Sequence, residues 1–96
     1  MTPLLWSPQS LRDLENIRAY IAKDSPLYAD LVIRRLVVAV ERLSNFPESG
    51  RMVPERSSPE IREVIVKPYR IVYRVREGTV EIVTIFRASR LFPDFV

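Results

Sequence analysis

This chain of 96 residues contains no cysteine and no histidine. The missing cysteine rules out disulfide bonds and thiolate metal sites, and it favours a reducing compartment, the cytoplasm. The missing histidine removes the commonest general base and the commonest metal ligand, and with them every Ser-His or Cys-His catalytic arrangement. The carboxylates show no spacing typical of a metal or glycosidase site. We therefore expect no metal and no other cofactor.

Long apolar runs are also missing. No stretch approaches the roughly 18–20 residues that are needed to cross a bilayer. The N-terminus has no basic segment leading into an apolar one, as a signal peptide would. We expect a cytoplasmic protein without a membrane partner. The length suits a single domain spanning residues 1–96, and 47% hydrophobic residues are normal for a globular chain.

The excess positive charge lies in the second half of the chain. Residues 1–50 hold six bases and six acids, whereas residues 51–96 hold nine bases and six acids, which gives the net charge of +3. Thirteen of the fifteen bases are arginine, whose planar guanidinium suits phosphate and carboxylate groups. Two interpretations stay open at this point: a solvated basic surface, or an anionic partner that docks on the C-terminal half.

Two amphipathic helices are predicted in the first half. Ser7 and Ser25 are each followed by proline, the pattern of an N-cap with proline at the first helical position. Apolar residues then recur at helical spacing: Leu11, Leu14, Ile17 and Ile21, then Ala29, Val32, Ile33, Leu36, Val40 and Leu43. The short connection predicts an antiparallel helical hairpin. A short edge or terminal strand at residues 3–6 precedes it, and Pro47 is expected to end it.

The hydrophobic period changes to two after residues 46–60, a segment with three prolines that is predicted to be a loop. Residues 61–66, 69–76 and 79–86 predict a three-stranded antiparallel meander, with turns at Lys67-Pro68 and Glu77-Gly78. The complete prediction is an α+β fold: a short N-terminal strand, an antiparallel helical hairpin, and then the three-stranded meander.

The second turn sets the predicted register. With the turn at residues 77–78, Arg74 faces Glu81, an opposite-charge pair that supports this register. The apolar face of the hairpin must meet the helices. The opposite, open face is predicted to carry Arg70, Arg74, Arg76 and Arg87, with Arg87 diagonal to Arg70.

Several sequence segments follow one another in an order that is found in a known protein family. They are W-S-P-Q-S-L-R-D-L-E-N-I-R-A-Y-I-A at residues 6–22, F-P-E-S-G-R at 46–51, Y-R-I-V-Y-R-V at 69–75 and R-A-S-R-L-F-P at 87–93. This text resembles the RelE/ParE family of small bacterial toxins, and it is most similar to the ParE branch. The resemblance implies the toxic half of a type II toxin–antitoxin pair, with a cognate antitoxin as one partner. The second partner is DNA gyrase for ParE-like members, or the ribosome with messenger RNA for RelE-like members. Neither branch of the family implies a small-molecule substrate.

The resemblance also implies candidate site residues on the open face of the sheet. Arg70 matches the arginine of the Y-R strand, Arg87 falls where many relatives have histidine, and Arg90 matches the basic position that follows. No tyrosine or histidine follows Arg87. Because arginine stays protonated, it stabilises anions well and transfers protons poorly. The expected target-binding or antitoxin-binding residues are Arg70, Arg87, Arg90 and Arg74.

These features favour a gyrase inhibitor that is not an enzyme. One alternative is a ribosome-dependent endoribonuclease that uses Arg70, Arg87 and Lys67, with Lys67 as a possible base. Another alternative is a non-toxic member of the family that only binds its antitoxin.

Overall fold

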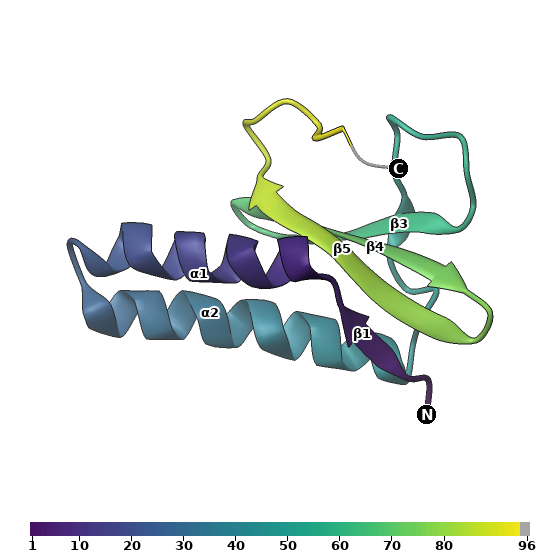
Figure 1. The fold of residues 1–96 in the computed structure, drawn as a ribbon, viewed down its shortest axis with the longest axis horizontal. Coiled ribbons are helices and arrows are strands. Elements are labelled where there is room, and N and C mark those ends of the chain that lie inside the picture. Colours follow the sequence, from purple (N-terminus) through teal and green to yellow (C-terminus); the bar gives the residue numbers. More distant parts are fainter. Residues whose placement is uncertain (95–96) are drawn as a thin grey trace.

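The computed structural model describes residues 1–94 as two layers, a pair of helices and a sheet (Figure 1). The helices are α1 (Pro8–Ala22) and α2 (Pro26–Glu41), and a short 3-10 helix η1 (Arg42–Ser44) follows α2. The strands are β1 (Leu4–Trp6), β2 (Arg51–Met52), β3 (Ile61–Val66), β4 (Tyr69–Arg76) and β5 (Thr79–Arg87). The predicted α+β fold, with its helical hairpin and antiparallel meander, is confirmed.

Both helices begin as the sequence predicts. The Ser7 hydroxyl accepts a hydrogen bond from the backbone N–H of Ser10 at 3.0 Å, and the Ser25 hydroxyl accepts one from Tyr28 at 3.1 Å. A proline occupies the first turn of each helix. α2 ends at Glu41, and the chain tightens into η1 before it reaches Pro47.

The five strands lie in the order β1-β5-β4-β3-β2. β3, β4 and β5 form the predicted antiparallel meander, and β1 adds to the β5 edge in parallel. β2 is a strand inside the segment predicted to be a loop. Its two residues pair as Arg51 with Glu63 and Met52 with Arg62. A strand of two residues is too short to produce an alternating pattern, so it could not be predicted from hydrophobic periodicity.

A β-bulge changes the register in the middle of the β4–β5 hairpin. Near the turn, Arg74 faces Glu81 and Tyr73 faces Ile82, as predicted. The next residue of β4, Val72, faces Thr84, so Val83 is an extra residue on β5.

The bulge reverses the facing of the last part of β5. Arg70 lies opposite Phe86 and not Ile85, while Arg87 lies opposite Tyr69. Because directly opposite residues point to the same face of a sheet, Arg87 shares the face of Tyr69, which packs in the core with the helices. The prediction that Arg70 and Arg87 share a face is therefore wrong.

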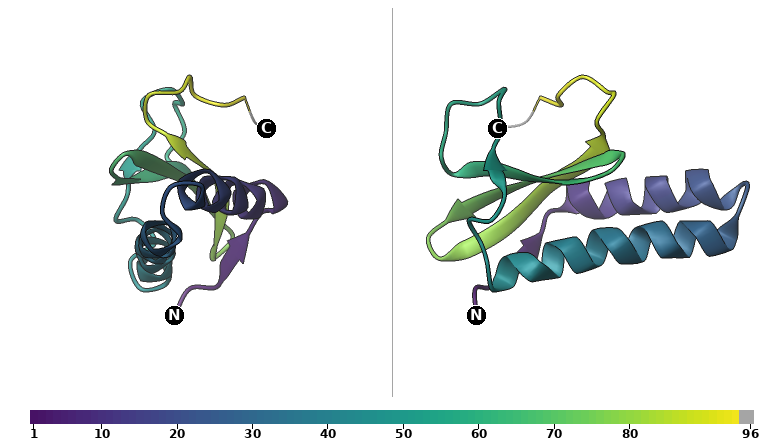
Figure 2. Two further views of the ribbon diagram at one scale, coloured as in Figure 1. Left: turned by 90° about the vertical axis from the view of Figure 1, so that its left-hand side faces the viewer. Right: turned by 180° about the vertical axis from the view of Figure 1, so that it is seen from behind.

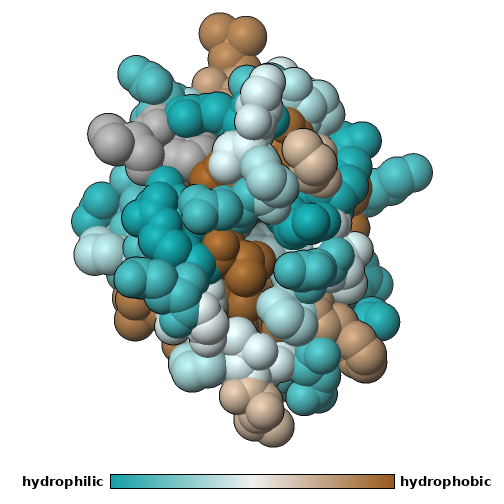
Figure 3. Space-filling view, turned by 90° about the vertical axis from the view of Figure 1, so that its right-hand side faces the viewer, coloured by the Kyte–Doolittle hydropathy of each residue, from teal (hydrophilic) through white to brown (hydrophobic). Residues whose placement is uncertain are grey.

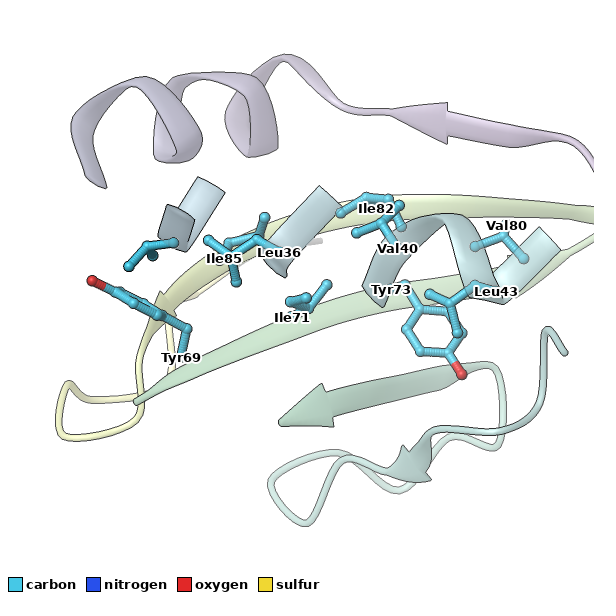
Figure 4. Close-up of a cluster of buried hydrophobic side chains, with 10 residues drawn as sticks. Leu36, Val40, Leu43, Tyr69, Ile71, Tyr73, Val80, Ile82 and Ile85 are labelled. Atoms are coloured by element: carbon cyan, nitrogen blue, oxygen red, sulfur yellow. The ribbon is translucent and has the colours of Figure 1, made fainter. Parts of the chain in front are cut away.

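The sheet buries apolar residues on both faces. The larger core lies between the helices and the sheet (Figure 4); its buried residues are Val32, Leu36, Val40, Leu43, Tyr69, Ile71, Tyr73, Val80, Ile82 and Ile85. The smaller core lies on the other face, where the 53–60 loop and the C-terminal tail pass over the sheet (Figure 2). It consists of Val53, Ile61, Val72 and Phe86, with Val83 and Phe92 packed against them. The face predicted to be open is thus partly covered.

Tyr73 of β4 contacts the segment that follows η1. Its hydroxyl accepts a hydrogen bond from the backbone N–H of Gly50 at 2.9 Å. Burial raises the pKa of the Tyr73 phenol. A Cβ atom on residue 50 would lie 2.5 Å from the carbonyl oxygen of Glu63 and 2.6 Å from the Tyr73 hydroxyl. Only glycine fits this close approach.

Candidate functional site

Arg70, the first predicted site residue, is buried on the sheet face away from the helices. Only 7% of it is exposed. Its Nε donates to Glu63 Oε1 at 2.6 Å, and its two terminal nitrogens donate to the two oxygens of Glu55 at 2.8 and 3.0 Å. Glu63 is itself buried, and its other oxygen accepts from Arg51 Nε at 2.6 Å. We call these four side chains the Arg70 network.

The charges of the Arg70 network compensate one another. The hydrogen bonds from Arg70 hold the pKa of Glu55 below its usual value. The pKa of Arg70 is raised, mainly by its hydrogen bonds to Glu55 and then by those to Glu63. An uncompensated charge at the Glu63 position would be costly, because that side chain is removed from water.

Two aromatic rings complete the enclosure of Arg70. Its guanidinium carbon lies 5.3 Å from the centre of the Phe86 ring and 5.2 Å from that of Phe92, within cation–π range. Phe92 belongs to the C-terminal tail, and Glu55 belongs to the 53–60 loop. Arg70 therefore joins two irregular segments to the sheet, and an external anion would have to displace the Glu55 carboxylate.

Arg74 lies farther along the same face of β4. Its terminal nitrogen is 3.5 Å from Glu81 Oε1, as the predicted cross-strand pair requires. Arg76, at the end of β4, has Glu60 at 3.7 Å. This end of the molecule shows hydrophilic residues around a small apolar area (Figure 3).

Arg87, Arg90 and Lys67 come together on the other side of the sheet. Two adjoining cavities there have volumes of about 110 and 220 Å³. Tyr20, Tyr69 and Arg87 line both of them. We call the combined hollow the basic trough; its other polar or charged lining residues are Tyr28, Arg35 and Lys67 in the smaller cavity, and Asp13, Asn16 and Arg90 in the larger one.

The basic trough has unbalanced positive charge. Within residues 1–94, no ion pair is formed by Arg35, Lys67, Arg87 or Arg90. The carboxylate that lines it, Asp13, accepts hydrogen bonds from the Thr84 hydroxyl at 2.6 Å and the Ile85 N–H at 2.9 Å. The Arg87 guanidinium carbon lies 5.8 Å from the centre of the Tyr69 ring.

The structure thus divides the predicted site residues into two groups. Arg87, Arg90 and Lys67 line one hollow, while Arg70 and Arg74 lie across the sheet from it. Sequence reasoning missed the helical contributions, Tyr20, Tyr28 and Arg35. These residues lie outside the apolar stripes of their helices. A tyrosine outside such a stripe is expected to be exposed, and this could have marked Tyr20 and Tyr28 as candidate binding residues.

A third feature is a hollow of about 530 Å³ between α2 and β3, which we call the α2–β3 groove. Its lining includes Arg42, Phe46 and Ile65. An adjoining surface of α2, which we include in the α2–β3 groove, is lined by residues that include Leu31, Arg34, Arg35 and Val38. β2 covers only part of β3, so residues 64–66 pair with β4 alone among the described strands. The groove therefore combines apolar side chains, unpaired arginines and a free strand edge.

The described residues contain no group of three or more acidic, histidine or cysteine side chains that could hold a metal ion. Within residues 1–94, no helix is long and apolar enough to span a membrane.

Comparison with known proteins identifies close relatives of the sequence. A family described as ParE toxin of the type II toxin–antitoxin system parDE matches residues 4–92. Toxin RelE2 from Caulobacter vibrioides is 41% identical over 92 residues, which cover 95% of this chain and 100% of the relative. Putative toxin Y4kP from Sinorhizobium fredii is 39% identical over 89 residues, which cover 93% of this chain and 91% of the relative.

Solved structures share the fold. A chain of the chromosomal ParDE toxin–antitoxin system from P. aeruginosa has a TM-score of 0.75 and 24% identity, over 91% of this chain and 96% of that chain. A chain of the toxin–antitoxin complex RelBE2 from Mycobacterium tuberculosis has a TM-score of 0.63 and 20% identity, over 90% of this chain and 96% of that chain.

Proposed function

The chain belongs to the ParE toxin family of type II toxin–antitoxin systems, and from that premise we propose that its target is DNA gyrase and that a cognate antitoxin neutralises it. The matched family is the ParE family, although one curated relative carries the name RelE. The choice between gyrase and the ribosome therefore has to come from the site itself.

The division of Arg70 from Arg87 is the observation that favours gyrase. A ribonuclease must orient the 2′-hydroxyl, stabilise the phosphorane and protonate the leaving oxygen at a single phosphodiester. Arg70 is enclosed by Glu55 and Glu63, and Arg87 lies on the opposite face of the sheet. The two arginines cannot act on one phosphate group, so a ribonuclease site that uses Arg70 together with Arg87 is not available on either face of the sheet.

A plasmid cleavage assay tests the proposal. Purified toxin is incubated with gyrase and supercoiled plasmid, and the products are separated after detergent and protease treatment. We expect cleaved plasmid to accumulate above the level seen with gyrase alone. The Lys67→Glu/Arg87→Glu variant should lose most of this effect, whereas Arg76→Glu, at the other end of the β4–β5 hairpin, should retain it. A wild-type toxin that leaves gyrase unaffected would contradict the proposal.

One observation favours a second function, messenger RNA cleavage on the ribosome. Lys67, Arg87 and Tyr28 line the same small cavity, which brings a candidate base, an anion-stabilising group and a hydroxyl together. Primer extension on translated messages in expressing cells would then show cuts in phase with codons. Expression without growth arrest would instead indicate a non-toxic member that only binds its antitoxin.

The α2–β3 groove is the proposed docking site for the antitoxin. Exposed Leu31, Val38 and Ile65 can receive the apolar side of a peptide, and the free edge of β3 can accept a strand. Arg34 and Arg42 form no ion pair with the described residues, which favours an acidic segment. Arg70 is too enclosed to take this role.

Calorimetric titration with the antitoxin tests this docking. The antitoxin is taken from the gene adjacent to the toxin gene. Arg34→Glu/Arg42→Glu should weaken binding by about tenfold or more, since each reversed charge at an interface costs on the order of 1 kcal/mol or more. Arg76→Glu is the matched control and should bind within about twofold of wild type. Equal affinities for the two variants would place the antitoxin elsewhere.

A further inference from the structure

Within the described residues, the basic trough gathers four cations without a carboxylate partner, a property that it shares with the arginines of the α2–β3 groove. Elsewhere, Arg18, Arg51, Arg70, Arg74 and Arg76 each have a carboxylate partner. In the trough, Arg35, Lys67, Arg87 and Arg90 are exposed and have none among residues 1–94. Asp13 forms no ion pair with these cations, and its Oδ2 atom already accepts hydrogen bonds from the Thr84 hydroxyl and the Ile85 N–H. The trough is therefore a surface prepared for an anion.

Exposed aromatic rings border these cations. Tyr20 is 69% exposed and Tyr28 is 51% exposed, although both lie on well-formed helices next to the sheet. A tyrosine that contributes to a core would be buried, as Tyr69 and Tyr73 are. Rings of this kind can stack on nucleic-acid bases without reading their sequence.

Each of the two cavities in the trough is small. Pockets for drug-sized molecules usually measure about 300–1,000 Å³, whereas these cavities, taken singly, measure about 110 and 220 Å³. They suit the compact phosphate groups of a chain that passes over the surface. The bases of that chain would remain outside, beside the exposed rings of Tyr20 and Tyr28; the Lys23 ammonium lies 5.8 Å from the centre of the Tyr20 ring.

We propose that the basic trough binds single-stranded DNA, with Arg35, Lys67, Arg87 and Arg90 on the phosphates and Tyr20 and Tyr28 stacked on bases. The proposal rests on the proposed action at gyrase, in whose cleaved complex the broken strands would be the DNA that this trough contacts. A duplex hides its bases from such rings, so unpaired nucleotides suit the trough better.

An acidic protein segment is the other class of anion, and the α2–β3 groove suits it better. That groove offers the aliphatic residues Leu31, Val38 and Ile65 beside its arginines. The trough also has aliphatic lining, including Ile21, Val66 and Pro68, but its large exposed nonpolar side chains are the rings of Tyr20 and Tyr28. We therefore assign the α2–β3 groove to a peptide and the basic trough to a nucleic acid.

Fluorescence anisotropy with a labelled 15-nucleotide oligothymidine, in the absence of gyrase, tests the proposal. The wild-type chain should bind with an affinity that falls with salt, because each phosphate contact adds about 0.7 to the slope of log affinity against log salt for a single strand. Lys67→Glu/Arg87→Glu should weaken binding at least about tenfold, and it should lower that slope by about 1.4. Arg76→Glu makes the same kind of charge change at the far end of the hairpin and should bind within about threefold of wild type.

The tyrosines are tested separately from the charges. Tyr20→Ala/Tyr28→Ala should weaken oligothymidine binding about fivefold or more, because stacking contributes at least about 1 kcal/mol per base. The same variant should bind a 15-base-pair duplex within about twofold of wild type. Both positions are exposed on helices, so the variant should fold, and its far-ultraviolet circular dichroism should match that of the wild type.

Several results would overturn the inference. They are a folded wild-type chain that does not bind oligothymidine, an Arg76→Glu variant weakened as much as Lys67→Glu/Arg87→Glu, and an oligoglutamate peptide that competes as well as DNA. The plasmid cleavage assay on the same preparation separates this failure from failure of the proposed function. Gyrase poisoning without oligothymidine binding overturns the inference alone, whereas binding without poisoning supports the trough and contradicts gyrase as the target.

Discussion

Both carboxylate oxygens of Glu55 face the two terminal nitrogens of Arg70, at 2.8 and 3.0 Å. This parallel arrangement is the strongest geometry available to an arginine–carboxylate pair. Glu55 lies in an irregular loop, and its side chain is 42% exposed. The pair therefore fixes the loop on the sheet while leaving the carboxylate accessible to protons.

Protonation of Glu55 should weaken the fold in acid. Its pKa in the folded protein lies below the usual 4.5, so the unfolded chain takes up its proton first. The stabilisation is complete above about pH 4.5 and is lost as the pH falls through the lowered pKa. In urea unfolding between about pH 5 and pH 3, the free energy of unfolding should fall less steeply for Glu55→Gln than for wild type. Glu15→Gln, on the exposed face of α1, should follow the wild-type slope.

Removal of Arg70 should leave the buried Glu63 carboxylate without the more buried of its two arginine partners. Arg70→Met is expected to lower the free energy of unfolding by about 3–5 kcal/mol, the usual cost of breaking a buried ion pair from one side. The double variant Arg70→Met/Glu63→Gln should lose less than Arg70→Met alone, because no buried charge remains. Chemical denaturation of the four proteins of this cycle measures the coupling. Additive losses would show that the two side chains act independently.

A side chain at position 50 should strain the contact between the chain after η1 and the sheet. Gly50→Ala places a Cβ atom 2.5 Å from a backbone oxygen that cannot rotate away. We expect a loss of about 1–3 kcal/mol in the free energy of unfolding, as for other overpacked sites. Ser49→Ala, at the exposed neighbouring position, should change it by less than about 0.5 kcal/mol. Thermal unfolding of both variants provides the comparison.

A substitution in the β4–β5 turn should stabilise the protein. Glu77 has φ of 53° and Gly78 has φ of 72°, the pattern of a two-residue turn that prefers Asn-Gly. Glu77→Asn should stabilise the protein by roughly 0.5–1 kcal/mol, since asparagine tolerates positive φ better than glutamate. The midpoint of thermal unfolding should rise by a few degrees. Alanine does not tolerate positive φ better than glutamate, so Glu77→Ala should not raise the unfolding midpoint. An equal rise in this variant would show that removal of the negative charge is the cause.

Local signals were sufficient to predict most of the fold. Ser7 and Ser25 marked the starts of both helices, and the Glu77-Gly78 turn fixed the start of the hairpin register. Each of these signals is contained within a few neighbouring residues, where backbone geometry and residue type are directly coupled.

The failures came from contacts between distant parts of the chain. Val83 is an ordinary strand residue, and nothing nearby in the sequence indicates a bulge there. The neighbouring Thr84 and Ile85 donate to Asp13, some 71 and 72 positions earlier. Likewise, the pairing of Arg70 with Glu55 depends on how a loop of 53–60 folds back. Alternation alone could place arginines on a strand, but it could not show which carboxylates would cover them.

The extra residue in β5 also affects how relatives of this chain should be compared. The bulge absorbs Val83, so a homologue without this residue would keep Thr84 opposite Val72 and Arg87 opposite Tyr69, on the face that meets the helices. A gap-free alignment with such a homologue, counted from the turn, would shift every later residue of β5 by one position. It would therefore equate side chains that project from opposite faces of the sheet. Assignments of shared activity should therefore be checked for this insertion before residues are matched.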